Sequence, residues 1–240
     1  MIGGQPGMQS RKVARFLLTL FAGVALAQNG RITSGAYSVQ PAPNDVAAFR
    51  DQTQLLSFRT LLKPANPECS SEETLEVVSL AGPYLGIRQD SYSHCKEAAH
   101  PSTERKLATF DLSNSGRPIA ITDLFPEAEV VRALSQDPVL TPYIEKKPAT
   151  LKALLAALPE EGVIAGDTPC TFEVLPGGFA MHHMEAGQVA VRVSLIPVPG
   201  ACRGLHPELG ILLPVPASLK APLVAAPPRT PKAKLVFEVR

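Results

Sequence analysis

The first 27 residues most constrain what this chain can fold into, because they have the pattern of a secretory signal. Arg11, Lys12 and Arg15 precede an apolar run over residues 16–27 that ends in Ala25-Leu26-Ala27. A basic segment, a short apolar segment and small residues before a cleavage point define such a signal. The twelve residues of this run, at about 1.5 Å each, are too short to cross a hydrocarbon core about 30 Å thick. We therefore expect a cleaved signal peptide at 1–27 and a secreted or periplasmic mature protein without a transmembrane anchor; the alternative is an uncleaved N-terminal anchor.

The charge of the mature chain argues against nucleic acid as a partner. The whole chain carries a formal net charge of +1, and removal of the three basic residues of the signal leaves −2. The remaining basic residues are scattered and tryptophan is absent, so neither a basic patch nor a stacking platform is indicated. The roughly 210 mature residues suffice for one domain with a sizeable core.

The exported part holds all four cysteines, Cys69, Cys95, Cys170 and Cys202. An even number of cysteines in an oxidising compartment predicts two disulfides, for which three pairings exist. We favour Cys69–Cys95 and Cys170–Cys202, because each pair closes a loop within one half of the chain. The alternative is a Cys/His metal site, but the sequence has no C-x-x-C and no histidine at ligand spacing from a cysteine pair.

Runs rich in β-branched and apolar residues predict strands in both halves of the chain. Residues 90–102 between two of these runs are polar and predict a loop, and Pro176-Gly177 predicts a hairpin turn. The predicted strands cover residues 74–80, 84–88, 106–112, 119–121, 171–175, 178–183, 188–196 and 211–215.

Two helices are predicted between the two groups of strands. The first begins at Pro126 and stops before Asp137-Pro138, since the residue before a proline disfavours helix. The second covers about 149–158, where leucines recur at helical spacing and Thr150 can cap the start. Strands, then helices, then strands predict an α+β fold, in which a mainly antiparallel sheet packs with about two helices in a single domain with two disulfides.

The two ends of the mature chain have a different composition from the middle. Residues 28–50 are rich in Gly, Ser, Pro and Asn. We therefore expect residues 28–73 to form a loosely ordered lead-in that contains the first structural elements. Residues 220–240 form a Pro-rich C-terminal tail that either adds a last strand or stays outside the domain. The predicted domain is therefore 74–219.

Within 74–219 two groups of short segments stand out, first Val78–Leu85, Ala99–Thr103, Phe110–Leu112 and Ile121–Phe125, and then Phe172–Phe179 and Leu212–Val215. In this order they resemble a bacterial extracellular domain family. This family includes the extracellular domain of the lysozyme-sensing anti-sigma factor RsiV and a domain of the peptidoglycan deacetylase PdaC. The resemblance implies a non-catalytic recognition domain facing the cell envelope, with lysozyme-like enzymes or peptidoglycan as ligands. Where the family has Gly-Gly before Ala-His, this chain has Glu97-Ala98.

The best candidate for a binding site is the polar stretch that holds Tyr92, His94 and His100. One aromatic ring and two imidazoles can hydrogen-bond a sugar or a protein partner. The alternative is structural: His100 caps a turn and Tyr92 packs at the edge of the sheet.

Two other groups of residues invite a chemical interpretation. His182 and His183, flanked by Met181 and Met184, have the donor atoms that soft metals prefer. On a regular strand, however, neighbouring side chains point to opposite faces, so we expect one buried and one solvated histidine and no metal site.

Asp111 and Asp123 are conceivable as paired carboxylates for acid–base catalysis. Both come where predicted strands end, and aspartate there commonly bonds the backbone of a turn. The sequence has no G-x-S-x-G motif and no Gly-rich phosphate loop. We therefore expect no catalytic residues and no cofactor.

Three functions follow as hypotheses. The first is a secreted or periplasmic binding domain that recognises lysozyme-like enzymes or peptidoglycan. The second is an envelope hydrolase whose site the sequence does not reveal. The third is a structural or assembly component of the envelope, for which the Pro-rich tail would act as a spacer.

Overall fold

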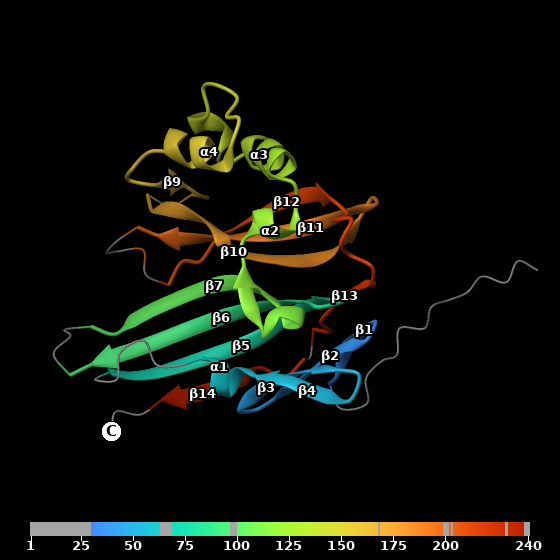
Figure 1. The fold of residues 1–240 in the computed structure, drawn as a ribbon. Coiled ribbons are helices and arrows are strands. Elements are labelled where there is room, and N and C mark those ends of the chain that lie inside the picture. The colour runs from blue at the N-terminus through green and yellow to red at the C-terminus, as the bar shows by residue number, and fades with distance from the viewer. Residues whose placement is uncertain are drawn as a thin grey trace, which may run out of the picture.

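The computed structural model describes residues 30–62, 69–96, 100–167, 169–198, 202, 204–228 and 230–237. Their elements form three antiparallel sheets and a layer of helices, stacked one above another (Figure 1). This arrangement confirms the predicted α+β fold with mainly antiparallel sheets in a single domain. The predicted signal peptide, residues 1–27, lies outside the described residues.

The central sheet contains the longest run of neighbouring strands, in the order β13-β5-β6-β7-β8, and β14 also pairs with β5. The predicted strands at 74–80 and 84–88 are parts of longer strands, and so is the one at 106–112 except for its last residue, Leu112, which begins a 3-10 turn. The predicted loop at 90–102 is wrong for its first residues, because β6 continues as far as Cys95 in register with β5. The strands are β5 (Cys69–Ala81), β6 (Tyr84–Cys95), β7 (Ser102–Asp111), β8 (Arg117–Ile119), β13 (Leu223–Ala225) and β14 (Ala233–Phe237).

The second sheet lies above the central one in Figure 1 and has the order β12-β11-β10-β9. The hairpin turn predicted at Pro176-Gly177 is wrong: β10 continues through these residues, with a register shift between Val174 and Phe179. The turn to β11 instead uses Ala186 and Gly187, both at positive φ, as a two-residue hairpin turn requires. The strands are β9 (Val163–Ile164), β10 (Thr171–Glu185), β11 (Gln188–Pro197) and β12 (Glu208–Pro214).

The helices α3 and α4 cover the outer face of the second sheet (Figure 1). Both were predicted, and the Thr150 hydroxyl accepts a hydrogen bond from the Ala153 amide at 3.1 Å, as its capping role requires. Phe172, Phe179 and Leu154 are buried in the core between the helices and the sheet. The helices here are α2 (Ile121–Leu124), α3 (Glu127–Ser135) and α4 (Leu151–Ala157), with single 3-10 turns at Leu112–Asn114 and Thr141–Tyr143.

The N-terminal residues form a third sheet under the central one, in the order β1-β2-β3-β4. The expectation of a loosely ordered lead-in is therefore wrong for residues 32–57. A further short helix follows, from which fully buried Phe58 packs edge-on against Phe110 with ring centroids 4.9 Å apart. The elements are β1 (Ile32–Ser34), β2 (Tyr37–Ala42), β3 (Asp45–Arg50), β4 (Thr53–Ser57) and α1 (Phe58–Leu61).

The C-terminal residues belong to the fold as well. Both β13 and β14 pair antiparallel with β5, and Ala233 and Leu235 are buried in the core between the central and N-terminal sheets. The predicted domain end at 219 therefore leaves out two strands of the central sheet.

Both predicted disulfides are present. Cys69 and Cys95 lie directly opposite each other on β5 and β6, and Cys170, just before β10, is joined to Cys202, which lies between β11 and β12. Two disulfides fit a protein of an oxidising compartment. In the described part of the chain, no helix has both the length and the apolar character needed to cross a membrane.

The central and second sheets meet through apolar contacts and through hydrogen bonds of hydroxyl groups. Val78, Leu107 and Ala180 form a small apolar cluster between them, and Ala81 of β5 belongs to the larger core of the second sheet. Hydrogen bonds connect the sheets beside this cluster: Thr109 donates to the Phe179 carbonyl at 2.8 Å, and Ser79 donates to the Met181 carbonyl. The second sheet therefore covers one half of this face of the central sheet and leaves the other half, near Cys95, open.

Candidate functional site

The open half of the central sheet presents two polar rows and the start of a third. Residues directly opposite on antiparallel strands share a face, and so do residues two apart on one strand. The register of β5, β6 and β7 therefore places eight side chains together, which we call the polar face: Glu72, Tyr92 and Thr103; Thr74, Asp90 and Arg105; Glu76 and Arg88.

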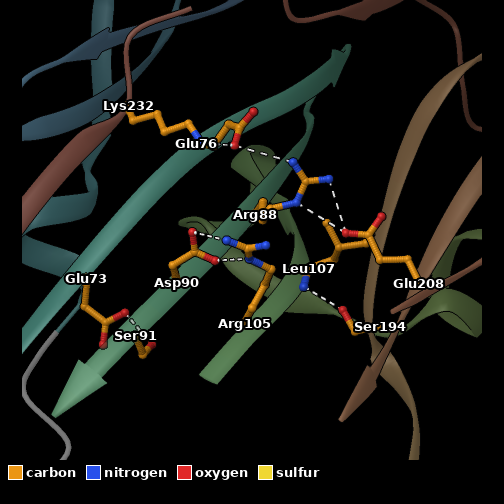
Figure 2. Close-up of polar contacts among 10 residues, drawn as sticks. All are labelled: Glu73, Glu76, Arg88, Asp90, Ser91, Arg105, Leu107, Ser194, Glu208 and Lys232. Carbon is orange, nitrogen blue, oxygen red and sulfur yellow. Dashed lines mark hydrogen bonds and ion pairs between the residues drawn. The ribbon is translucent and has the colours of Figure 1, made fainter. Parts of the chain in front are cut away.

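Ion pairs connect the polar face to its surroundings (Figure 2). Arg88 lies between Glu76, at 3.4 Å, and Glu208 at the start of β12, at 3.2 Å. Lys232 reaches Glu76 from the other side at 2.7 Å. Burial alone would raise the pKa of Glu76, but the two cations Lys232 and Arg88 outweigh it and hold the pKa below its usual value.

Asp90 and Arg105 form a two-bonded ion pair in the middle of the polar face (Figure 2). The second of these bonds, from Arg105 Nη2 to Asp90 Oδ2, is 3.1 Å long. The bonds to Asp90 raise the pKa of Arg105 above its usual value. A planar pair of this kind presents both donors and acceptors at fixed positions.

A groove of about 330 Å³ opens over the polar face, beside the chain segment at residues 204–206. Tyr92 is 44% exposed at this groove. His206 lies opposite, and its Nδ1 atom is buried without a hydrogen-bond partner among the described residues. Burial, with a smaller contribution from Arg105, lowers the pKa of His206 and so favours the neutral imidazole. The groove is lined by Glu72, Thr74, Asp90, Ser91, Tyr92, Thr103, Glu104, Arg105, Gly204 and His206.

The three residues singled out in the sequence have different positions relative to this groove. Tyr92 lines it. His94 is exposed on the same face of β6, two residues nearer the disulfide, and does not line the groove. His100 is exposed just before β7, beyond the last pair of the β6–β7 ladder. Tyr92 and His94 therefore share a face of β6, and both lie on a strand and not in the predicted loop.

Sequence reasoning missed Asp90, Arg105 and His206. Asp90 and Arg105 are neighbours only through the register of β6 and β7, and His206 lies more than a hundred residues further along the chain. The polar residues at 88, 90 and 92 were the available signal, because alternate polar residues on a strand indicate one solvent-facing side.

The two adjacent histidines of β10 do not point to opposite faces as predicted. A register shift lies between Met181 and His183, so that His182 is an extra residue without its own partner on β11. Such a bulge interrupts the alternation of side chains. The Nδ1 atoms of His182 and His183 lie 2.8 Å apart as a result. Burial, followed by the effect of His183, lowers the pKa of His182.

The two candidate carboxylates have the turn roles that the sequence suggested. Asp111 accepts hydrogen bonds from the amide and the hydroxyl of Ser113, and Asp123 accepts one from the Ala120 amide at the start of α2. Among the described residues, no group of three or more His, Cys, Asp or Glu side chains is placed to hold a metal ion.

Comparison with known proteins adds no relative to this description. No family model, no curated protein and no solved structure matches the chain.

Proposed function

We propose that the mature chain is a secreted or periplasmic, non-catalytic binding domain of the bacterial envelope, and that the groove on the polar face binds its ligand. The exposed ring of Tyr92 beside the Asp90–Arg105 pair is the observation that carries this proposal. The resemblance to the RsiV and PdaC domains offers two ligands, a lysozyme-like enzyme and peptidoglycan.

The charges of the groove favour the glycan of peptidoglycan over a basic protein. Each carboxylate that lines the groove already has a cation of the same chain as its partner. Glu72 lies 2.7 Å from Lys234, Glu104 lies 3.5 Å from Lys106, and Asp90 is bonded to Arg105. A surface neutralised in this way has little net attraction for a charged partner, but its oxygens and N–H groups still bond hydroxyl and amide groups.

The shape of the site points in the same direction. An aromatic side chain with an apolar ring and a polar tip suits a ligand with both an apolar and a hydroxylated face. A sugar ring has these two faces, and Thr103 and His206 add hydrogen-bonding groups around Tyr92. The volume of about 330 Å³ lies within the usual range for small-ligand sites.

A binding titration of the oxidised mature protein, residues 28–240, tests the proposal. One arm uses soluble disaccharide–peptide fragments of peptidoglycan, and the other uses hen-type lysozyme. We expect saturable binding of the fragments, which Tyr92→Ala weakens by roughly thirtyfold, corresponding to the loss of about 2 kcal/mol from an aromatic anchor. Tyr92→Phe should bind almost as the unmodified protein does, because the ring is retained.

A matched control changes a tyrosine away from the groove. Tyr143 lies on the helical side, where its hydroxyl accepts a hydrogen bond from Ile164, and Tyr143→Phe should leave binding unchanged. Binding of lysozyme alone, weakened by Tyr92→Ala, would keep the groove and replace its ligand. Binding of neither ligand, or binding insensitive to Tyr92→Ala, would contradict the proposal.

A further inference from the structure

Strand β14 extends the surface around the groove by one strand. Its register with β5 pairs Lys234 with Thr74 and Val236 with Glu72, so both side chains lie on the same side of the sheet as the polar face. The ion pair between Lys234 and Glu72, at 2.7 Å, agrees with this placement. Neither Lys234 nor Val236 lines the groove. The surface on which the groove lies therefore continues past it, across β5 and onto β14.

One row of side chains on this surface has an exposed apolar group at two of its four positions. The row, which we call the Tyr92 row, takes one residue from each of β14, β5, β6 and β7: Val236, Glu72, Tyr92 and Thr103. Val236 is 57% exposed and Tyr92 is 44% exposed. These two side chains are two strands apart, which is about 9.5 Å at the usual strand spacing. The neighbouring row is polar or charged throughout: Lys234, Thr74, Asp90 and Arg105.

A β-1,4-linked glycan has a repeat that fits this spacing, and the glycan of peptidoglycan is a chain of this kind. Successive sugars in such a chain are turned over, so that every second ring presents the same face. The repeating disaccharide is close in length to two strand spacings, so each sugar corresponds to one strand. With one sugar at Tyr92, the next lies at Glu72 and the one after it presents its apolar face to Val236. Both apolar side chains then remove such a face from water, which stabilises the complex.

The polar positions of the row suit the sugars between and beside the apolar contacts. Glu72 already has Lys234 as its ion-pair partner, so its carboxylate adds no net charge to the site. Its oxygens still accept hydrogen bonds from hydroxyl and amide N–H groups, both of which N-acetylated sugars carry. The hydroxyl of Thr103 both donates and accepts, and it stands at the position of a fourth sugar.

We propose that a β-1,4-linked chain of N-acetylated sugars binds across the strands, with one sugar per strand along the Tyr92 row and Val236 as a binding residue. This inference rests on the function proposed above. It adds the length and direction of the ligand, which is a chain of four sugars perpendicular to the strands and not a disaccharide confined to the groove.

Calorimetric titration of the oxidised mature protein with soluble oligomers of β-1,4-linked N-acetylglucosamine tests the proposal. We expect the tetrasaccharide to bind roughly tenfold more tightly than the disaccharide, because only the longer chain contacts both Tyr92 and Val236. Val236→Thr keeps the shape of the side chain but replaces a methyl by a hydroxyl group. It should remove most of this difference and leave the disaccharide affinity unchanged. Val236→Tyr should increase the difference, since an aromatic ring covers more of a sugar.

A matched control changes a valine of similar exposure on another sheet. Val215 directly follows β12 and is 43% exposed, and Val215→Thr should leave the affinity for both oligomers unchanged. Equal unfolding midpoints show that each variant is folded. Equal affinities for the two oligomers, or a difference that Val236→Thr leaves intact, would overturn the inference, whereas loss of disaccharide binding in Tyr92→Ala would still support the groove. Failure of both oligomers to bind would also overturn it, and titration with disaccharide–peptide fragments then decides separately whether the proposed function stands.

Discussion

Ser194 provides the sharpest test of how the two larger sheets are joined. Its side chain is 3% exposed, and its Oγ accepts a hydrogen bond from the Leu107 amide at 2.7 Å. Strand β8 pairs with β7 only at residues 109–111. The Leu107 amide therefore lies on an edge of β7 that β8 does not cover, and a side chain of the second sheet takes the place of a strand partner (Figure 2).

Ser194→Ala removes this acceptor and leaves a buried amide without one. An unsatisfied buried donor costs about 1–3 kcal/mol. Leu107 is 1% exposed, so water cannot replace the lost hydroxyl, and we expect a loss near the middle of that range. With a urea dependence of about 2 kcal/mol per molar, the unfolding midpoint should fall by about 1 M.

Urea unfolding of the oxidised protein measures this loss, and hydrogen exchange of the Leu107 amide measures its cause. The control is Ser91→Ala, because the Ser91 hydroxyl donates to Glu73 at a partly exposed site, where water can substitute. That variant should change stability by less than about 0.5 kcal/mol. If Ser194→Ala leaves both the midpoint and the protection of the Leu107 amide unchanged, the sheets are not joined in the way described.

Two further predictions concern pH and helix capping. The pKa of His206 is below 6.5 in the folded protein because of burial and Arg105, while Asp90 and Glu104 act weakly in the opposite direction. As the pH falls below about 6.5, the unfolded chain binds the proton first. Stability should therefore decrease until the folded pKa is passed, and urea midpoints of His206→Gln should lack this part of the decrease. Thr150→Ala removes the hydroxyl that accepts from the Ala153 amide and should cost about 1 kcal/mol in urea unfolding, whereas Thr150→Ser should retain most of it.

Local patterns predicted those parts of the fold in which one face is buried and the other is exposed. The leucines of α4 recur at helical spacing because one side of the helix packs on the second sheet. Strand β11 was predicted from its alternation, and it is a central strand of that sheet. In both segments, the burial that stabilises the element also produces the pattern in its sequence.

The elements that sequence reasoning missed depend on contacts with distant residues. Strands β1 to β4 have only three to six residues each. The residues around them in the sequence are of types common in turns, such as Gly, Pro and Asn. Their stability comes from packing under the central sheet, which no local pattern reports. Likewise, Pro176 and Gly177 resemble a turn, but the pairing of β10 with β11 on both sides makes them an irregularity within one strand.

The candidate site was partly predictable for the same reason. Tyr92 was found because it is an aromatic residue in a polar stretch. Its neighbours Asp90 and Arg105 required the register of β6 and β7, and His206 required knowledge of where the connection between β11 and β12 lies. The two histidines of β10 were expected to point to opposite faces, as on a regular strand, and a single inserted residue brings their rings together instead.

Both disulfides lie close to the groove. Disulfides form in an oxidising compartment, which is where the predicted signal peptide would send the chain. Cys95 follows Tyr92 by three residues and is held opposite Cys69, so that the end of β6 cannot separate from β5. Cys202 precedes Gly204 and His206, and its bond to Cys170 fixes the segment that lines the other side. The groove therefore lies between two segments that are each held by a disulfide, the end of β6 on one side and residues 204–206 on the other.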